Sequence, residues 1–183
     1  MCAADAGRRA VTTPRAVLTV CTGNLCRSPL AEVLLRRALQ AAGVSDVSVS
    51  SAGMYPAHGL ALPDATLAAA ARRGLDLTAH VPRALDLDEL ARAELVLCAS
   101  RRHRARVLAL LGPGGMDQRR ADAGEPCVGG GDLRVRLMHD ALDDTRGLDV
   151  PDPYGCDDGT HELVAALLER AMNAWAEQLA ADS

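Results

Sequence analysis

Cys21 and Arg27 lie in the stretch VCTGNLCRSP, residues 20–29, where five residues separate them. Gly23 and Asn24, which lie between them, are types that accept unusual backbone angles. A loop of this composition can turn tightly enough to point several backbone N–H groups at one anion, and an arginine can bind two oxygens of that anion. The spacing therefore predicts a cradle for a tetrahedral oxyanion of the size of phosphate.

Cys21 is the candidate nucleophile of this cradle, because donors that favour a bound anion also favour a thiolate over a thiol. A thiolate below a bound phosphate can attack phosphorus and form a phosphocysteine. Arg27 and the loop N–H groups would hold the charge that spreads over the other oxygens. We expect Ser28 to be the N-cap of the helix that follows and Pro29 to be its first residue, so that the helix N-terminus adds to the attraction.

A phosphate ester also needs a general acid for its leaving oxygen, and Asp152 in the motif VPDPYG is the candidate. Pro151 and Pro153 stiffen the loop that carries this carboxyl. Tyr154 offers a ring that can stack on an aromatic leaving group. After the leaving group departs, the same carboxylate can deprotonate the water that hydrolyses the phosphocysteine, and this chemistry requires neither a metal nor another cofactor.

Alternating strands and helices must position the two motifs. Apolar or alternating runs predict strands at 16–20, 47–51, 94–98 and 133–138. Helical periodicity and end signals predict helices at 29–43, 64–74, 86–93, 101–112 and 159–179. This order implies an α/β fold, in which helices cover both faces of a parallel sheet. The loops that leave the carboxyl ends of the strands meet at one edge, so we expect Cys21 and Asp152 to lie close together there.

The length of 183 residues and the hydrophobic fraction of 49% predict one globular domain. We expect a flexible N-terminal segment at 1–14, a single domain over 15–183, and a mobile loop in the glycine-rich stretch 112–132. The net charge of −4 gives no reason to expect a nucleic acid or an anionic membrane as partner. Residues 1–14 lack the apolar region of a secretion signal and no run is long enough to span a membrane, so the expected location is the cytoplasm.

The other candidate groups have plainer interpretations. Cys26 either packs at the base of the loop or captures an oxidised Cys21 as a disulfide, and the sequence leaves both open. Cys98 lies in an apolar strand and is expected in the core. The run RRHRAR at 101–106 is interpreted as a solvated helix face, with docking of an acidic partner as the alternative. Two further sets carry no assigned function: the cysteines of flexible segments, Cys2, Cys127 and Cys156, and a cluster without metal-site spacing, His139, Asp140, Asp143 and Asp144.

The motifs VCTGNLCRSP and DPYG together resemble those of the low-molecular-weight protein tyrosine phosphatase family. The similarity runs from residue 16 to about residue 179 and includes SSAGM at 50–54, ARRGLDLTAHVPRAL at 71–85 and ELVLCASRRHR at 94–104. The resemblance implies a four-stranded parallel sheet of flavodoxin-like order with helices on both faces. It also implies Cys21 as nucleophile, Arg27 as phosphate clamp, and Asp152 as general acid and base.

The resemblance further implies the surroundings of the nucleophile. Ser28 is expected to hydrogen-bond the sulfur of Cys21, and Asn24, Ser51 and His80 to form a network that holds the loop. The expected partners are proteins that carry phosphotyrosine, and the oligomeric state is left open. The residues expected at the substrate are Thr22, Gly23, Asn24, Leu25, Cys26, Ser28, Tyr55 and Tyr154.

This sequence departs from the family pattern in several places. An aromatic wall of the substrate cleft is usual shortly after Ser-Ala-Gly, whereas here the region is MYPAHG and Tyr55 is shifted. A second aromatic residue often follows DPY, and here Gly155 stands in that place. Ser100 stands where an aspartate is common, which leaves one contact that supports the loop unexplained. The stretch 112–132 is longer than usual.

Other activities use similar chemistry. A phosphatase that acts on small aryl or alkyl phosphates would need the same residues. A thiol-dependent arsenate reductase would need a second cysteine close to Cys98, and the next one is Cys127. A phosphoarginine phosphatase would have a loop that resembles CTGNTCRSP, with a threonine in the position of Leu25. Leucine at this position favours an apolar phenyl ring over a guanidinium group. A non-catalytic module that binds phosphotyrosine would not need Cys21, Arg27 and Asp152 together.

Overall fold

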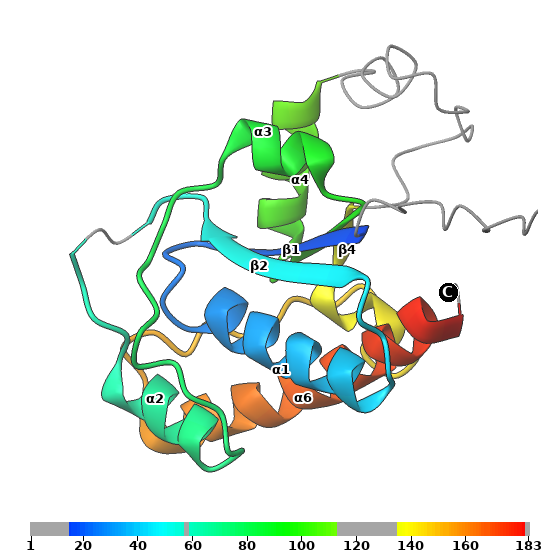
Figure 1. Ribbon diagram of the computed structural model, residues 1–183. Helices are drawn as coiled ribbons and strands as arrows, with labels where there is room; N and C mark the ends of the chain where they lie inside the picture. Colours follow the sequence, from blue (N-terminus) through cyan, green and yellow to red (C-terminus); the bar gives the residue numbers. More distant parts are fainter. Residues whose placement is uncertain (1–14, 57–58, 113–134, 182–183) are drawn as a thin grey trace, which may run out of the picture.

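The computed structural model describes residues 15–56, 59–112 and 135–181, and these ranges form a layered α/β fold (Figure 1). Its parallel sheet has the order β2-β1-β3-β4, which confirms the expected fold class and flavodoxin-like order. The strands are β1 (Arg15–Cys21), β2 (Val47–Gly53), β3 (Leu95–Cys98) and β4 (Val135–Leu137). Each lies within two residues of its predicted bounds, except that the predicted start of β4 falls outside the described residues.

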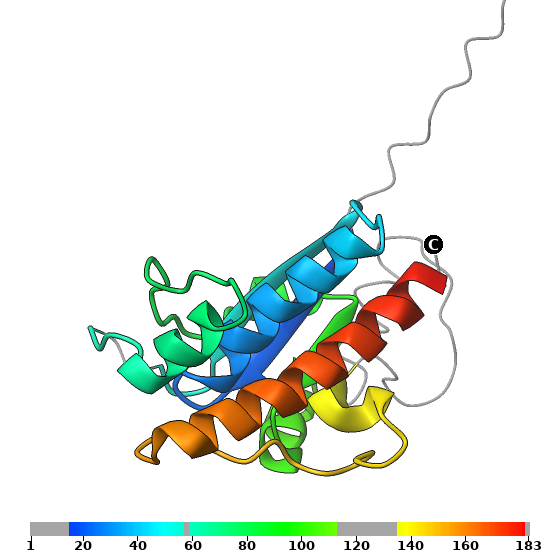
Figure 2. The ribbon, with the colours of Figure 1, turned by 90° about the horizontal axis from the view of Figure 1, so that it is seen from below.

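Helices cover both faces of the sheet, as Figures 1 and 2 show. One face carries α1 (Arg27–Ala41), α2 (Asp64–Ala71) and α6 (Asp158–Ala181). The other face carries α3 (Leu87–Arg92) and α4 (Arg101–Leu111). The sequence did not predict the short 3-10 helix η1 (Met138–Ala141), which follows β4 directly.

Two hydrophobic clusters hold these layers together, and alternation along β1 supplies both of them. Val17 faces the cluster that includes α1 and α6, whereas its neighbour Leu18 faces the cluster beneath α3 and α4. Trp175 of α6 closes the first cluster, where its indole N–H donates to the carbonyl of Met138 at 2.9 Å. Cys98 is fully buried in the second cluster, as expected of a core residue.

The start of α1 differs from the prediction. The helix begins at Arg27 with Cys26 as N-cap residue, so the predictions of Ser28 as N-cap and of Pro29 as first helical residue are both wrong. The physical reason is that the Ser28 hydroxyl points into the protein, where it meets the sulfur of Cys21 at 3.0 Å and the carbonyl of Ala52 at 3.2 Å. Ser28, although serine is a favoured capping residue, therefore makes its side-chain contacts behind the loop.

The carboxyl edge of the sheet brings the two motifs together. β1 ends at Cys21, and the backbone N–H of Val150 donates to the carbonyl of Ala99, just after β3, at 2.8 Å. This bond ties the segment that carries Asp152 to the strand next to β1. Cys21 and Asp152 meet at this edge although 130 residues separate them along the chain.

Several expectations lie outside the described residues: the flexible segment 1–14, most of the loop 112–132, and Cys2 and Cys127. Within the described ranges, none of the helices is both long and apolar enough to cross a membrane.

Candidate active site

The loop after β1 forms a cradle whose backbone is fixed by two close approaches. Asn24 has φ 56°, and it is the one non-glycine residue with positive φ in the described chain. Gly53 at the end of β2 lies so close that an added Cβ would be 2.8 Å from the carbonyl oxygen of Thr22 and 3.0 Å from the Asn24 nitrogen. Only glycine leaves room for the cradle against β2, which gives the Ser-Ala-Gly motif a physical role.

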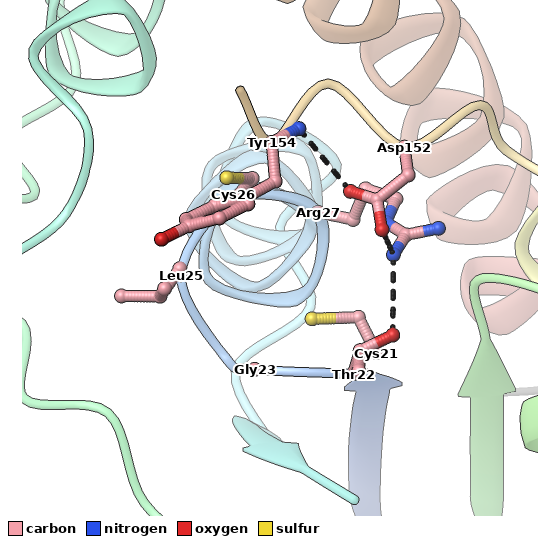
Figure 3. Close-up of a pocket in the computed structure, with 8 residues that line it drawn as sticks. All are labelled: Cys21, Thr22, Gly23, Leu25, Cys26, Arg27, Asp152 and Tyr154. Carbon is pink, nitrogen blue, oxygen red and sulfur yellow. Dashed lines mark hydrogen bonds and ion pairs between the residues drawn. The ribbon is translucent and has the colours of Figure 1, made fainter. Parts of the chain in front are cut away.

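The pocket above the cradle has a volume of about 260 Å³ (Figure 3). Cys21 lies at its base and is 2% exposed. The pocket is lined by Cys21, Thr22, Gly23, Leu25, Cys26, Arg27, Asp152 and Tyr154. Three residues that we expected at the substrate do not line it: Asn24, Ser28 and Tyr55.

The sulfur of Cys21 lies 3.0 Å from the hydroxyl oxygen of Ser28. The side-chain amide of Asn24 donates to that same oxygen at 3.0 Å, so the single hydroxyl proton is free to point at the sulfur or at the carbonyl of Ala52. If the sulfur is a thiolate, this proton has a charged acceptor and the hydrogen bond is strengthened.

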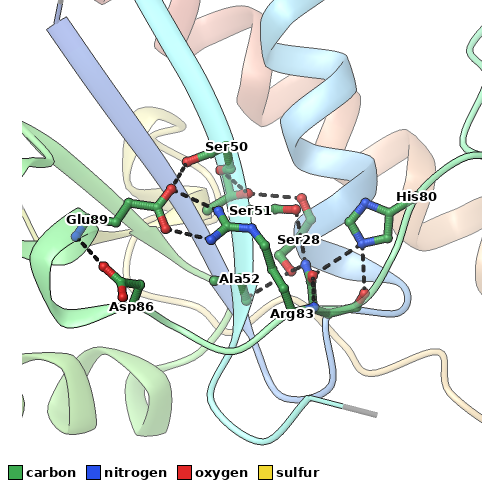
Figure 4. A network of polar contacts seen from close by, with 10 residues as sticks. Ser28, Ser50, Ser51, Ala52, His80, Arg83, Asp86 and Glu89 are labelled. Carbon is green, nitrogen blue, oxygen red and sulfur yellow. Dashed lines mark hydrogen bonds and ion pairs between the residues drawn. The ribbon is translucent and has the colours of Figure 1, made fainter. Parts of the chain in front are cut away.

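Asn24 is the centre of a buried polar network behind the cradle (Figure 4). Its amide also donates to the Ser51 hydroxyl at 3.0 Å, and its carbonyl Oδ1 accepts from the backbone N–H of Arg83 at 3.0 Å. Nε2 of His80 lies 3.2 Å from this Oδ1 and 3.1 Å from the backbone oxygen of Asn24. The structure thus brings Asn24, Ser51 and His80 together, with Ser28 joined to them.

A second layer of contacts, which the sequence did not predict, supports this network. Arg83 binds the carboxylate of Glu89 through both terminal guanidinium nitrogens, at 2.6 and 2.8 Å, and the Ser50 hydroxyl donates to the same carboxylate (Figure 4). The backbone N–H of Gly53 donates to the carbonyl of Arg83, and the carbonyl of Gly53 accepts from the N–H of Leu85. These bonds hold the segment that carries Arg83 against the end of β2.

Arg27 reaches from the start of α1 into the pocket with a side chain that is 6% exposed. One terminal nitrogen lies 2.5 Å from Oδ2 of Asp152 and also donates to the Thr22 hydroxyl at 3.4 Å. The other donates to the carbonyl of Val150 at 3.3 Å. The guanidinium is therefore held between the cradle and the segment that carries the carboxyl.

Asp152 and Tyr154 form the outer edge of the pocket. The side chain of Asp152 is 51% exposed and Tyr154 is 57% exposed. The backbone N–H of Tyr154 donates to Oδ1 of Asp152 at 3.3 Å, and its ring lines the pocket on the same side as Leu25 and Cys26 (Figure 3). Gly155, which replaces an aromatic residue of the family pattern, has φ 78°, a conformation that favours glycine.

His103 is the residue near the site that the sequence interpretation missed. We expected the run 101–106 to be a solvated face, but His103 is 7% exposed and its Nε2 lies 2.9 Å from the Thr22 hydroxyl. Its Nδ1 lies 2.8 Å from the hydroxyl of Ser100, which also caps α4 by accepting from the His103 N–H. The signal that could have found it is its position four residues before the apolar Val107, which places both on the same face of the helix.

Ser100, which stands where an aspartate is common in the family pattern, is joined to Thr22 of the cradle through His103. Burial, and then the nearby charge of Arg27, lower the pKa of His103 to about 4. The imidazole is therefore neutral at pH 7, with one ring nitrogen as donor and the other as acceptor. A neutral chain of Ser100 and His103 thus reaches the cradle at Thr22.

The remaining cysteines differ in their surroundings. Cys26 lines the pocket beside Cys21, and burial raises its pKa to about 11, which keeps it a thiol near neutral pH. Neither interpretation of Cys26, packing or disulfide partner, is decided by these contacts. Cys156, expected in a flexible segment, lies in a turn where its N–H donates to the carbonyl of Pro153 at 2.9 Å.

In the described chain, no group of three or more histidine, cysteine, aspartate or glutamate side chains has the geometry of a metal site. His139, which the sequence placed beside several aspartates, is 2% exposed. Neither of its ring nitrogens has a hydrogen-bond partner among the described residues. Burial lowers its pKa. This histidine is a buried neutral group.

Comparison with known proteins identifies relatives over nearly the whole chain. A family model described as low molecular weight phosphotyrosine protein phosphatase matches residues 16–183. The low molecular weight protein-tyrosine-phosphatase Etp of Escherichia coli (strain K12) is 33% identical over 164 residues, which are 89% of this chain and 93% of that relative.

Two solved structures show the breadth of this fold. The tyrosine phosphatase Wzb from Escherichia coli K30, in complex with sulphate, is 27% identical with a TM-score of 0.69, over 90% of this chain and 97% of that one. The YwlE arginine phosphatase from Geobacillus stearothermophilus is 24% identical with a TM-score of 0.69, over 92% of this chain and 95% of that one, and shares the fold. Since the family model covers almost every residue and Etp exceeds 30% identity, this chain belongs to the low molecular weight phosphotyrosine protein phosphatase family and is a phosphatase enzyme.

Proposed function

We propose that this chain hydrolyses phosphotyrosine in proteins, with Cys21 as nucleophile and a phosphocysteine as intermediate. The observation that carries the proposal is the meeting of a thiol, a guanidinium and a carboxyl group in one pocket, from Cys21, Arg27 and Asp152. These are the nucleophile, the oxyanion clamp and the proton donor that transfer of a phosphoryl group from an ester needs. Membership of the family supports the same chemistry.

Substrate binding exchanges the partner of Arg27. Asp152 is its anionic partner at 2.5 Å, and a phosphate group has enough oxygens to take both terminal nitrogens of the guanidinium. An arriving phosphate therefore displaces Asp152 from Arg27. The released carboxyl stays at the outer edge of the pocket, where the bridging oxygen of the ester lies when the phosphate is in the cradle.

The first step transfers the phosphoryl group to the protein. The thiolate of Cys21 forms a bond to phosphorus while the bond between phosphorus and the tyrosine oxygen breaks. Once it has left Arg27, the carboxylate of Asp152 takes up a proton from solvent, and it then gives this proton to that oxygen, so tyrosine leaves as a neutral phenol. Arg27 and the backbone N–H groups of the cradle hold the three remaining oxygens.

The second step returns the enzyme to its starting state. The carboxylate of Asp152 takes a proton from water, and the water oxygen attacks phosphorus as the bond to sulfur breaks. Inorganic phosphate and the thiolate are released, and Asp152 loses its proton to solvent when it pairs with Arg27 again. The Ser28 hydroxyl, 3.0 Å from the sulfur, can donate to this thiolate and make it a better leaving group.

The pocket walls support an aromatic substrate. Leu25 and Tyr154 line the pocket, and the Tyr154 ring lies on the same side of it as Leu25 and Cys26 (Figure 3). A flat phenyl ring between these apolar surfaces gains burial and stacking that a charged guanidinium would not gain to the same extent. This favours phosphotyrosine over phosphoarginine.

Burst kinetics with a phosphotyrosine peptide and with p-nitrophenyl phosphate, under reducing conditions and with a chelator present, test the proposal. We expect Cys21→Ser to lower kcat by about 10⁴-fold or more, by analogy with loss of other catalytic nucleophiles. Asp152→Ala should lower it by about 10²- to 10⁴-fold on the peptide and less on p-nitrophenyl phosphate, whose leaving group depends less on a general acid.

The same assay separates the alternatives. Faster release of phosphate from a phosphoarginine peptide than from the phosphotyrosine peptide would overturn the substrate assignment and leave the nucleophile in place. A wild-type protein that binds phosphate but hydrolyses none of these esters would contradict the proposed activity itself.

A further inference from the structure

A second pocket of about 370 Å³ opens beside the active site and shares Thr22 with it. Its other wall residues include Met54 and Tyr55 from the loop after β2, and Arg102 and Arg106 from α4. We call this pocket the arginine subsite. Tyr55, which we expected at the substrate, lines this pocket instead of the one above Cys21.

The arginine subsite is fixed to the cradle on both sides. The backbone N–H of Met54 donates to the carbonyl of Cys21 at 3.0 Å, and that of Tyr55 donates to the carbonyl of Thr22 at 2.9 Å. On the α4 side, His103 meets the Thr22 hydroxyl at 2.9 Å. The two pockets therefore keep a constant spacing, as a subsite for one continuous substrate requires.

The walls from α4 combine charge with open space. Arg102 and Arg106 are one helical turn apart and line the pocket together with Ala105 and Ala109, whose side chains are small. Both arginines are exposed. The pocket lies at the position where the sequence left docking of an acidic partner as an alternative.

These two positive charges are not neutralised within the described chain. Arg101 on the same helix pairs with Asp149, and Arg104 donates to the carbonyl of Val135, whereas no ion pair of the described residues involves Arg102 or Arg106. The described residues that line the pocket include no carboxylate. The pocket is therefore suited to an anion, although the whole chain carries a net charge of −4.

We propose that the arginine subsite binds an acidic side chain that lies close to the phosphotyrosine in the sequence of the substrate protein. An extended peptide advances about 3.3 Å per residue, so a side chain one or two positions from the phosphotyrosine reaches the pocket across Thr22. Both a carboxylate and a second phosphotyrosine supply the anion that Arg102 and Arg106 can bind. The inference rests on the proposed function, because it concerns the same substrate.

The test uses three phosphotyrosine peptides of equal length in which the flanking residues are glutamine, glutamate or a second phosphotyrosine. We expect wild-type kcat/KM to be about three- to tenfold higher for the glutamate peptide than for the glutamine peptide, as contacts with partly exposed charges give. This preference should shrink at about 1 M salt, where the Debye length is near 3 Å. The peptide with two phosphotyrosines shows whether phosphate or carboxylate is the preferred anion.

The variant Arg102→Gln/Arg106→Gln should lose the preference and keep the wild-type rate on p-nitrophenyl phosphate, which does not reach the subsite. Arg92→Gln is the matched control: it removes an exposed arginine from α3 and lies outside the arginine subsite, so the preference should remain.

A wild-type enzyme that does not distinguish the peptides, or a double variant that keeps the preference, would overturn the subsite. Hydrolysis of p-nitrophenyl phosphate tests the proposed function separately, because that ester has no flanking residues. If no ester is hydrolysed, the affinity of Cys21→Ser for the same peptides still decides the question. Equal affinity for the glutamate and glutamine peptides would overturn the inference in that case.

Discussion

The floor of the active site and its rim are built in opposite ways. The floor is the cradle together with the polar network behind it, in which Asn24, Ser28 and Ser51 are at most 2% exposed and share hydrogen bonds with one another. At the rim, Asp152 and Tyr154 are more than half exposed, and the Asp152 carboxylate contacts Arg27 and the backbone N–H of Tyr154.

This difference separates the parts of the site that set the chemistry from those that set the choice of substrate. Floor groups are partners of one another, so loss of one leaves others buried and unsatisfied and disturbs the whole cradle. Rim groups have few shared partners, so their changes should be local and close to additive. Three predictions test this division, and a fourth, on His139, tests stability far from the site; they are given in order of decreasing effect.

Gly53→Ala should have the largest effect, because the added Cβ would clash with the backbone of the cradle. Its Cβ would lie 2.8 Å from the Thr22 carbonyl oxygen, so the cradle has to shift. We expect kcat/KM on p-nitrophenyl phosphate to fall by about 100-fold or more, in line with the sensitivity of reactions to small misplacements. The free energy of unfolding should also fall, which urea denaturation measures.

Gly159→Ala is the matched control for this substitution. Its Cβ would meet only Asp157 Oδ1, at an ordinary 3.6 Å, near the start of α6. Alanine is a better helix former than glycine, so this variant should be at least as stable and as active as wild type. Equal behaviour of the two variants would contradict a special role for the approach of β2 to the cradle.

The sequence predicted the floor chemistry well because it is concentrated in short stretches. Cys21, Arg27 and the glycine between them lie in one loop, and the position of that loop after an apolar run predicted its place at the sheet edge. The order of strands followed from the resemblance and is confirmed by the sheet. Asp152 could be placed near Cys21 because parallel strands end at one edge.

The sequence could not predict contacts that depend on distances between separate elements. Nothing local to Gly53 says that the backbone of Thr22 lies 2.8 Å from its missing Cβ. The run RRHRAR is charged enough to predict solvent exposure, and the one buried position, His103, is recognised only when α4 has a known partner face. The bonds from Arg83 to Glu89 likewise join side chains whose orientation a linear pattern does not give.

His103→Ala should have the next largest effect, because this residue positions the cradle from its other side. Its removal leaves the Thr22 hydroxyl without the contact at 2.9 Å, and we expect kcat to fall by about tenfold, as loss of a supporting contact typically costs. His103→Gln, whose amide can reach the same hydroxyl, should recover part of this loss. An unchanged kcat in the alanine variant would assign His103 to the fold alone.

The profile of kcat against pH adds a second readout. Since the pKa of His103 is lowered to about 4, its protonation should not shape the profile between pH 5 and 8. The wild type and His103→Gln should therefore have profiles of the same shape in this range. A wild-type transition that the variant lacks would contradict a neutral, positioning imidazole.

Stability below neutral pH should depend on the buried histidines, and His139 offers a test far from the chemistry. Burial lowers its pKa, so between its lowered value and the ordinary value of about 6.5 the unfolded chain binds a proton that the folded chain does not. The contribution of His139 to the free energy of unfolding is therefore complete above about pH 6.5, and the free energy of unfolding should decrease as the pH falls below that value.

His139→Leu should make this decrease shallower. Both ring nitrogens lack a partner in the described chain, so an apolar side chain of similar size should leave stability at pH 7.5 unchanged or higher. Urea denaturation at pH 7.5, 6.5 and 5.5 gives the slope for both proteins. Identical slopes would mean that His139 takes up its proton in the folded state as readily as in the unfolded chain.

Tyr154→Leu should have the smallest effect, because it alters the rim without disturbing the floor. The stacking of its ring on a substrate phenyl group would be lost, and we expect kcat/KM for phosphotyrosine peptides to fall by about two- to tenfold, the range of aromatic pair energies. An alkyl phosphate has no ring to stack, so its kcat/KM should stay near the wild-type value.

When Tyr154→Leu is combined with Arg102→Gln/Arg106→Gln, the separate losses of kcat/KM on an acidic peptide should multiply, because the two groups lie in different pockets. A combined loss far from the product of the two would show that the rim is coupled, as the floor is, and that substrate choice is not separable from the cradle.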